Sequence, residues 1–573
     1  MRTILIFCMI IPCVIYSLSF SELADPDIPG VSQASLEWGD FDNDGFLDLL
    51  ITGHTGTEPI SRIYRNDGEG TFTWQSEIEF TGVSFGKGIW GDYNNDGWLD
   101  VLISGRDAGN QPVTKLYRNN GDGSFTELAG INLPGTEYCT INWVDFNNNG
   151  WLDVFIAGET ETETITRIYR NNGNDTFGWW GGFAFPGYRH ADSAWRDING
   201  NGYPDLIING RIGQTKTTSL YLNDSGNSFI LQQDTGFPDV DRGSAAWGDY
   251  DNDGLPDLLI TGLEASTRIA RVFRNLGEGA FQFTANLTGI AYGKGIWHDI
   301  NNNGLLDIII CGAASGVFDN LTTKVYLNTG NNSFQEAAGL GLVGLSYSAI
   351  SAIDLNDNGK TDLMITGMIS STVRDIKLYL NGTDVVNTLP SPPDLLSSVV
   401  SEGEVILSWN NGSDAETSDN GLSYNIWLQP YSDTELQLMA PMADSETGFR
   451  RVSKPGNAGF GNSFTLKDLP SGNYVWAVQT IDSVFTGSLF SNWQSFFIPQ
   501  YFLSPPVNLT ITESNSEFFL TWGEVTEASY YLIYASENPS ESNWQLIGET
   551  AGTELTVPAD QPMKFFRITA VME

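Results

Sequence analysis

The sequence predicts an all-β fold assembled from seven copies of one short unit. An acidic loop, which first reads WGDFDNDGFLD from Trp38 to Asp48, recurs along the chain. The later copies follow at spacings of 52, 53, 52, 52, 50 and 55 residues and start at Trp90, Trp143, Trp195, Trp247, Trp297 and Ala352. Such a regular period indicates one supersecondary unit repeated in an array. The 62 glycines and the many Asn-Gly and Asp-Gly steps are typical of turn-rich β structure.

Each unit is predicted to hold four strands joined by three tight turns. One apolar run leads into the acidic loop, and a second run, such as residues 48–53, leaves it as a strand buried on both faces. An aromatic-x-Asn signal marks the third strand, and a Phe after a Gly/Asn turn marks the fourth. Four-stranded units at this period predict the blades of a seven-bladed β-propeller over residues 20–385. The aromatic-x-Asn signals end at Asn66, Asn119, Asn171, Asn223, Asn275, Asn328 and Asn381.

The seventh unit lacks its fourth strand, because the sequence changes character after Asn381. The segment Phe20–Leu23 is similar to residues 125–128, which form the outer strand of an intact unit. We therefore expect Phe20–Leu23 to pair into the last blade, where it would protect the strand edge and tie the termini together. The alternative is an unpaired N-terminal tail.

These repeats resemble FG-GAP/VCBS repeats, the units of integrin-α-type seven-bladed propellers and of many secreted bacterial proteins. The Phe-Gly element of that name is matched by Phe85-Gly86 and Tyr292-Gly293, and the resemblance covers residues 20–381. It implies a calcium loop within a β-hairpin of each blade.

The acidic loops follow the pattern D-x-[DN]-x-[DN]-G-x-x-D, with oxygens at positions 1, 3, 5 and 9 and a glycine at position 6. This matches the start of an EF-hand loop, but no Glu occupies position 12, where Ile51 lies in the first copy, and strands flank the loop. Several hard oxygens at flexible spacing favour Ca²⁺ over Mg²⁺. No Cys/His cluster indicates zinc.

The loops differ in their number of carboxylates, and affinity should fall with that number. We expect up to seven calcium ions with a structural role, bound most tightly in the first and fifth loops. For the loops with two carboxylates, the alternative that Asp/Asn-Gly only forms turns stays open. The predicted ligands of the seven loops in order are Asp40, Asp42, Asp44, Asp48; Asp92, Asn94, Asp96, Asp100; Asp145, Asn147, Asn149, Asp153; Asp197, Asn199, Asn201, Asp205; Asp249, Asp251, Asp253, Asp257; Asp299, Asn301, Asn303, Asp307; and Asp354, Asn356, Asn358, Asp362.

The ends of the chain have a different character. Residues 1–19 resemble a secretory signal peptide, with a basic residue, a short apolar run and small residues before the expected cleavage site. Residues 386–393 form a Pro-rich linker, residues 394–499 resemble a fibronectin type III domain, and residues 500–573 a second, shorter one. The mature region has no further apolar stretch of spanning length. Its two cysteines, Cys139 and Cys311, are expected to be buried and unpaired rather than bridged.

Composition narrows the possible partners. With 28 basic and 70 acidic residues the net charge is −42, so nucleic acid and anionic membranes should repel the chain. Seven divalent ions would reduce the charge to about −28. We find no convincing catalytic constellation: Gly82–Gly86 matches G-x-S-x-G, but no helix is expected to follow it.

The sequence therefore predicts a secreted or cell-surface, calcium-binding recognition or adhesion module for a protein or glycan ligand. Trp179 and Trp180 in the fourth unit are candidate contacts, although aromatic residues more often pack in cores. The alternatives are an extracellular polysaccharide-active enzyme of lyase or hydrolase type, and a structural envelope or matrix component that binds no soluble ligand.

Overall fold

The computed structural model describes residues 18–572 except 24–25, 69, 402–403, 432–436, 468, 500, 503–506, 515–516, 526–527, 537–544 and 559–564. The described chain is all-β, and its one short helical turn is the 3₁₀ segment η1 (Asp419–Gly421). Among these residues no helix has the length and apolar character needed to cross a membrane. The predicted signal peptide falls mostly on residues 1–17, which lie outside the described residues.

The first four repeated units form antiparallel four-stranded sheets, each in sequence order from the inside of the ring outward. The first four sheets are β2–β5 (Ser32–Gly39, Asp48–His54, Pro59–Asn66, Phe72–Trp74), β6–β9 (Ser84–Gly91, Asp100–Arg106, Pro112–Asn119, Phe125–Glu127), β10–β13 (Glu137–Val144, Asp153–Glu159, Thr164–Asn171, Phe177–Trp180) and β14–β17 (Arg189–Arg196, Asp205–Ile212, Thr215–Asp224, Ser228–Leu231).

The fifth and sixth units share one strand. β22 (Phe281–His298) is extended throughout, so it closes the fifth sheet and also opens the sixth, which the sequence did not predict. The other strands of this pair are β18 (Val240–Asp241), β19 (Ala245–Gly248), β20 (Asp257–Glu264), β21 (Thr267–Asn275), β23 (Asp307–Ser315), β24 (Asp319–Asn328) and β25 (Phe334–Glu336).

The last sheet joins the two ends of the array. It contains β26 (Ser346–Ile353), β27 (Asp362–Met368), β28 (Arg374–Asn381) and the N-terminal strand β1 (Phe20–Glu22). Phe20 pairs with Asn381 and Glu22 with Tyr379, which confirms the predicted pairing of the N-terminal segment with the last unit.

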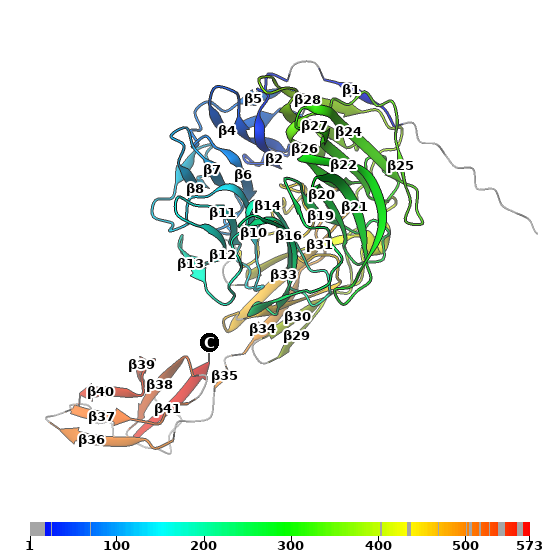
Figure 1. The fold of residues 1–573 in the computed structure, drawn as a ribbon. Coiled ribbons are helices and arrows are strands. Elements are labelled where there is room, and N and C mark those ends of the chain that lie inside the picture. The colour runs from blue at the N-terminus through cyan, green and yellow to red at the C-terminus, as the bar shows by residue number, and fades with distance from the viewer. Residues whose placement is uncertain are drawn as a thin grey trace, which may run out of the picture.

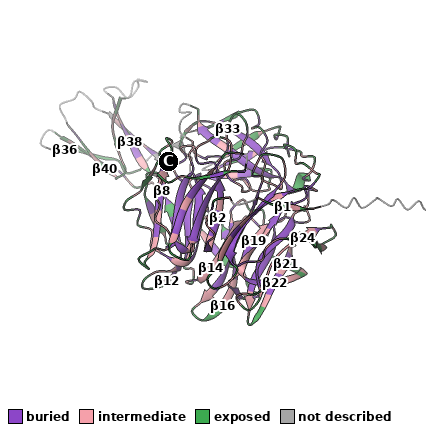
Figure 2. Ribbon diagram, turned by 90° about the horizontal axis from the view of Figure 1, so that it is seen from above, coloured by how far each residue is buried: buried purple, intermediate pink, exposed green. Residues whose placement is uncertain are grey.

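The sheets follow one another around a common centre (Figure 1). Successive innermost strands β2, β6, β10, β14, β19, β22 and β26 contact one another, and β26 in turn contacts β2. The second strand of each unit is buried on both faces, as its uninterrupted apolar run predicts; all residues of β3 but the last are buried. These buried strands are the purple arrows of Figure 2. Apolar side chains of neighbouring sheets form the cores between them.

The aromatic-x-Asn signal has a structural explanation that follows the whole ring. The Asn66 side-chain amide donates to the Leu355 carbonyl of the seventh unit at 3.0 Å, and Asn119 donates to Phe41 of the first unit at 2.8 Å. The other five asparagines, Asn171, Asn223, Asn275, Asn328 and Asn381, make the same bond to the preceding unit. Together with the bonds of Asn66 and Asn119, seven hydrogen bonds thus link the units in cyclic succession.

Two further sandwiches follow the ring. The first pairs the sheet β29 (Ser397–Ser401), β30 (Glu404–Ser408), β32 (Ser463–Lys467) with the sheet β31 (Ser423–Pro430), β33 (Gly472–Ile481), β34 (Gln494–Ile498) over a shared core. We call the segment from β29 to β34 the docking module. The second, around its own core, contains β35 (Tyr501–Phe502), β38 (Tyr530–Ser536), β39 (Gln545–Thr550) and β41 (Phe565–Met572), and β36 (Thr510–Ser514), β37 (Glu517–Thr521) and β40 (Glu554–Pro558).

Cys139 and Cys311 are both buried and free. The expectation of two unpaired thiols is therefore confirmed.

Candidate metal centre

The seven acidic loops occupy equivalent places in the ring. Each connects the first and second strands of its sheet, and its last aspartate is the first residue of the second strand, as Asp48 is of β3. The loops therefore lie at the same end of the innermost strands. The predicted ligands of each loop thus lie within one hairpin, and the loops of different units are separate from one another.

The first and last carboxylates of each loop organise the backbone. Asp40 accepts the Gly45 amide at 3.1 Å, and Asp48 accepts the Phe41 amide at 3.1 Å and the Asn66 amide at 2.9 Å. The bonds from the position 6 glycine and from the aromatic-x-Asn asparagine recur in all seven loops. These aspartates therefore shape the loop by hydrogen bonding, which is compatible both with a calcium loop and with the turn-forming alternative.

The remaining oxygens test whether the loops also fit a cation. Side-chain oxygens of Asp40, Asp42 and Asp44 lie within 4.8 Å of one another, and so do those of Asp249, Asp251 and Asp257. These are the first and fifth loops, where the sequence predicts the tightest sites. Position 3 adds a second observation: in four loops one of its oxygens is buried and accepts no hydrogen bond, namely Asp42 Oδ1, Asp251 Oδ1, Asn301 Oδ1 and Asn356 Oδ1. Buried acceptors without a donor, beside carboxylates, form a donor set that suits a hard cation.

Burial disfavours the ionised form of the first and last carboxylates of these loops and so raises their pKa. Burial raises the pKa of Asp40 to about 7 and that of Asp48 to about 9. In the fifth loop burial raises the pKa of Asp249 to about 7 and that of Asp257 to about 9. Neighbouring carboxylates contribute to each of these shifts in the same direction. A bound cation would reverse this effect by stabilising the ionised forms.

Arginines neutralise the carboxylate-rich loops from the third strand, which the sequence analysis missed. Arg65 Nε lies 2.6 Å from Asp42 Oδ2 and its guanidinium also contacts Asp44, while Arg274 Nε lies 2.5 Å from Asp251 Oδ2. The signal was present, because each is the middle residue of an aromatic-Arg-Asn triplet. The repulsion among the carboxylates is thus partly relieved without any metal.

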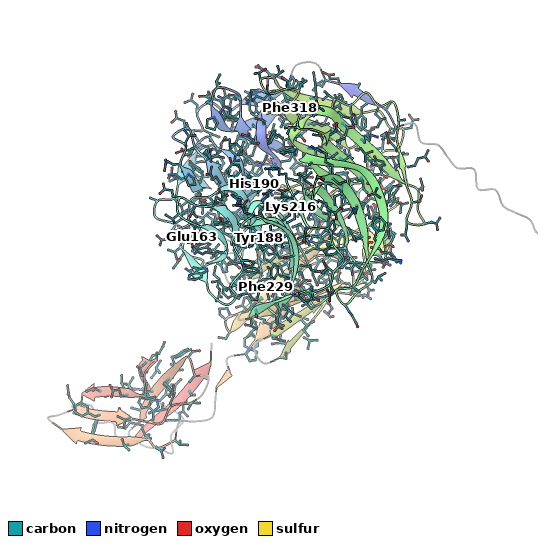
Figure 3. The ribbon with its side chains drawn as sticks, in the orientation of Figure 1. Glu163, Tyr188, His190, Lys216, Phe229 and Phe318 are labelled. Atoms are coloured by element: carbon teal, nitrogen blue, oxygen red, sulfur yellow. The ribbon has the colours of Figure 1, made fainter. Side chains whose placement is uncertain are left out.

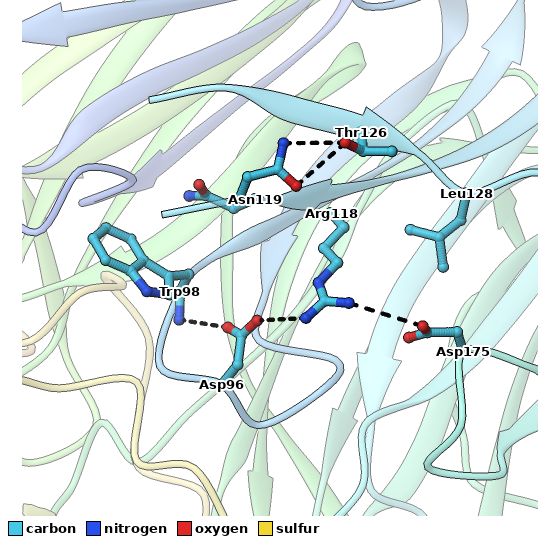
Figure 4. A pocket seen from close by; sticks show the side chains of 8 residues that line it. Asp96, Trp98, Arg118, Asn119, Thr126, Leu128 and Asp175 are labelled. Atoms are coloured by element: carbon cyan, nitrogen blue, oxygen red, sulfur yellow. Dashed lines mark hydrogen bonds and ion pairs between the residues drawn. The ribbon is translucent and has the colours of Figure 1, made fainter. Parts of the chain in front are cut away.

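The second loop shows this arrangement beside a surface pocket of about 490 Å³ (Figure 4). Arg118 reaches from the third strand to Asp96 at 3.5 Å and to Asp175 of the next unit at 3.9 Å. Trp98 and Leu128 complete the wall. Arg118 therefore occupies the open side of the carboxylate at position 5.

The docking module covers the loop face of the ring. The Arg451 carbonyl accepts the Asp40 amide at 3.0 Å, and its guanidinium donates to the Gly97 carbonyl at 2.7 Å. Val452 is buried beside Phe41 of the first loop, and Lys454 forms an ion pair with Glu37 at 3.1 Å. These residues belong to the long insert between β31 and β32. This insert therefore supplies part of the contact between the module and the ring.

Other loops meet the same module. Asn148 donates to the Thr465 carbonyl at 3.4 Å, and Ser483 Oγ donates to Asp299 at 3.3 Å. Sequence alone offered no signal for this contact, because the interface residues share no motif.

The other end of the innermost strands has its own repeated feature. In six units the pairing between the innermost strand and the second strand shifts register near this end, which indicates a β-bulge. In the fifth unit the innermost strand is instead interrupted, between β18 and β19. At each of these seven places one residue adopts φ between 46° and 55°, the left-handed region that side chains rarely occupy. All seven are partly exposed. We call this set the axial collar; it consists of Gln33, Phe85, Tyr138, His190, Arg242, Tyr292 and Tyr347.

A family model for the FG-GAP-like repeat matches residues 40–103, 92–156, 145–208, 197–260 and 299–365, which together span about half of the chain. The chain belongs to the FG-GAP-like repeat family. Each matched segment starts at the first aspartate of an acidic loop, and the FG-GAP-like repeats account for the loops and strands described above. No curated protein matches the chain.

Solved structures offer distant likenesses to this FG-GAP-like chain. The extracellular domain of the hybrid two component system BT3049 from B. thetaiotaomicron is 11% identical with a TM-score of 0.38, over 83% of this chain and 57% of that one. A mutant of AofleA from Arthrobotrys oligospora, in which three arginines are replaced by alanine, is 12% identical with a TM-score of 0.33, over 57% of this chain and 91% of that one. These values are too low for the neighbours to inform the function.

The two tryptophans singled out from the sequence lie in different environments, one exposed and one packed in a core. Trp179 is 64% exposed, with the Arg167 guanidinium 5.3 Å from its ring. Trp180 instead packs against Phe146 and Phe229 in the core between the third and fourth units, so only one member of the pair is available to a partner.

Proposed function

We propose that this FG-GAP-like protein is a secreted or cell-surface recognition module that binds an extracellular protein or glycan without chemical turnover. Its ring would be a seven-bladed β-propeller, its loops would bind structural calcium, and its two C-terminal sandwiches would be fibronectin type III-like spacers. One observation carries the binding role: the ring has two unlike faces, one covered by the docking module and one that presents the partly exposed axial collar.

Seven sheets in cyclic contact, with seven cyclic asparagine bonds, support the propeller. In the docking module, Tyr474 Oη donates to the Pro470 carbonyl at 2.6 Å, four residues upstream, as in the tyrosine corner of type III and related sandwiches.

The loop geometry supports calcium as a structural ion. The first and fifth loops have clustered carboxylates, and oxygens at position 3 lack donors. When bound, calcium would join the two strands of a hairpin at one end of each blade and so stabilise the folded ring by linkage. Because the docking module covers this face, we place the partner on the opposite one.

The test is an array of glycans and matrix proteins probed with the mature chain, in calcium and again in chelator. Binding to one ligand class, with no product released from the matching polysaccharide, is the expected result. Product release would instead favour the enzyme alternative. A blank array from a folded, calcium-loaded protein would favour a structural role in the envelope or matrix.

A further inference from the structure

The axial collar contains rings that contact one another around the centre of the blades. The Phe85 and Tyr138 ring centroids are 4.5 Å apart, those of Tyr138 and His190 are 4.4 Å apart, and those of Tyr292 and Tyr347 are 5.0 Å apart. In Figure 3, His190 and Lys216 lie near the middle of the ring of sheets. Residues that are about 50 positions apart in sequence thus form two aromatic groups, one of Phe85, Tyr138 and His190 and one of Tyr292 and Tyr347, because each occupies the same bulge of its own unit.

Cationic side chains accompany these rings. The Arg106 guanidinium lies 5.4 Å from the centroids of both Phe85 and Tyr138, and Arg242 lies 5.3 Å from the Tyr292 ring while donating to its hydroxyl at 3.1 Å. Cations over aromatic faces are held in place by the ring quadrupole. The guanidinium groups are therefore positioned beside the collar rather than extended freely into solvent.

The cationic side chains beside the collar outnumber the carboxylates with which they form ion pairs. Six basic residues pair with four acidic ones, because three of the basic residues share Asp241. These ion pairs therefore carry more positive than negative charge, in a protein with 28 basic and 70 acidic residues. The basic residues are Lys87, Arg106, Arg189, Arg211, Lys216 and Arg242; the acidic residues are Asp192, Glu137, Glu159 and Asp241.

One further cation, Lys294, has no carboxylate in direct contact, although Asp192 and Glu37 lie near enough to act on it. Lys87 forms an ion pair with Asp192 at 2.8 Å, but the Lys294 ammonium, two residues after Tyr292, makes no hydrogen bond or ion pair within the described residues. Burial and the neighbouring Lys87 lower the pKa of Lys294. A charge that is partly desolvated and unpaired would gain from an anion of its own.

We propose that the axial collar binds the acidic sugar of a glycan, such as a uronic or sialic acid, with its carboxylate at Lys294 and its ring against the collar aromatics. This inference rests on the proposed function and specifies the ligand class and the site. Aromatic faces suit the C–H face of a pyranose, and partly desolvated cations suit a carboxylate. An acidic peptide shares the carboxylate but not the rigid saturated ring, so the extent of the aromatic surface favours the sugar.

The test uses the mature chain in calcium against oligosaccharides that end in a uronic or sialic acid, and against the same oligosaccharides with the carboxylate reduced to an alcohol. We expect reduction to weaken binding at least tenfold, and this comparison requires no variant. Lys294→Met should lose at least tenfold in affinity, whereas Lys324→Met, in the exposed pair with Glu336 of the same unit, should bind as the parent does. Tyr138→Ala should weaken binding, and the exposed-aromatic control Trp74→Ala, on the outer strand β5, should not.

The outcomes separate this inference from the proposed function. Equal binding of the reduced sugars, or equal loss in Lys294→Met and Lys324→Met, would overturn the collar site while leaving recognition intact. Binding of Glu-rich peptides in place of the sugars, with the same sensitivity to Lys294→Met, would overturn the ligand class. No binding to any glycan or protein would overturn the proposed function itself. Thermal unfolding of each variant shows whether it is folded.

Discussion

Asn66→Leu tests the bond that joins the first unit to the seventh. The Asn66 amide donates to the carbonyls of Leu355 at 3.0 Å and Leu47 at 3.2 Å, and its oxygen accepts the Gly68 amide at 3.0 Å. Leucine has nearly the same shape but offers no partner, so two carbonyls would lose their donor in a site where Asn66 is 1% exposed. At about 1–3 kcal/mol for each unsatisfied buried group, the free energy of unfolding should fall by about 2–6 kcal/mol.

The assay is thermal and denaturant unfolding followed by tryptophan fluorescence. With about 2.1 cal/mol/K of unfolding entropy per residue, a ring of about 360 residues should lose roughly 3–8 °C in Tm. The control is Asn120→Leu, since the Asn120 amide contacts only exposed Ser124 and Thr126 side chains. A change for Asn66→Leu no greater than that of the control would refute the reasoning that these asparagines hold the ring together.

Three further predictions concern the loops and the docking module. In chelator, the free energy of unfolding should fall as pH rises from about 4 to 9. Burial raises the pKa of Asp48 and Asp257 to about 9, so in this range the folded state holds protons that the unfolded state has released. Unfolding measured from pH 4 to 9 should show this slope, and calcium should flatten or reverse it; a chelator-treated protein whose stability rises with pH would contradict the prediction. Arg65→Met should raise the calcium affinity of the first loop about tenfold by removing a competing cation, as titration calorimetry can measure; an unchanged or weaker affinity would mean that Arg65 does not compete. Val452→Asp should release the docking module from the ring, because the substitution buries a carboxylate in an apolar contact. Small-angle scattering should then show an enlarged radius of gyration. The control Val399→Asp, at a residue 61% exposed in the same module, should keep the parent radius, and equal radii for the two variants would contradict the docking of the module.

Local pattern made the repeated unit predictable. The four strands of each unit, the acidic loop between the first two, and the pairing of Phe20 with the last unit all follow from sequence, because each depends on hydrophobic period, turn chemistry and internal repetition. Among the three loops with at least three carboxylates at the predicted ligand positions, those with four, the first and the fifth, are the ones whose carboxylate oxygens converge. The carboxylate count did not identify Arg65 and Arg274, since an arginine on the third strand can be assigned to a loop only when the sheet register is known.

The sequence by itself determined which residues build each sheet and which oxygens share a loop, since these contacts lie within one unit of about 50 residues. Only the tertiary structure decided that the insert carrying Val452 covers the loop face, and that collar residues of neighbouring units, such as Phe85, Tyr138 and His190, contact one another. The physical reason is that both depend on contacts between segments far apart in the chain. Such contacts are set by the way the sheets close around their centre and leave no periodic signal in the chain.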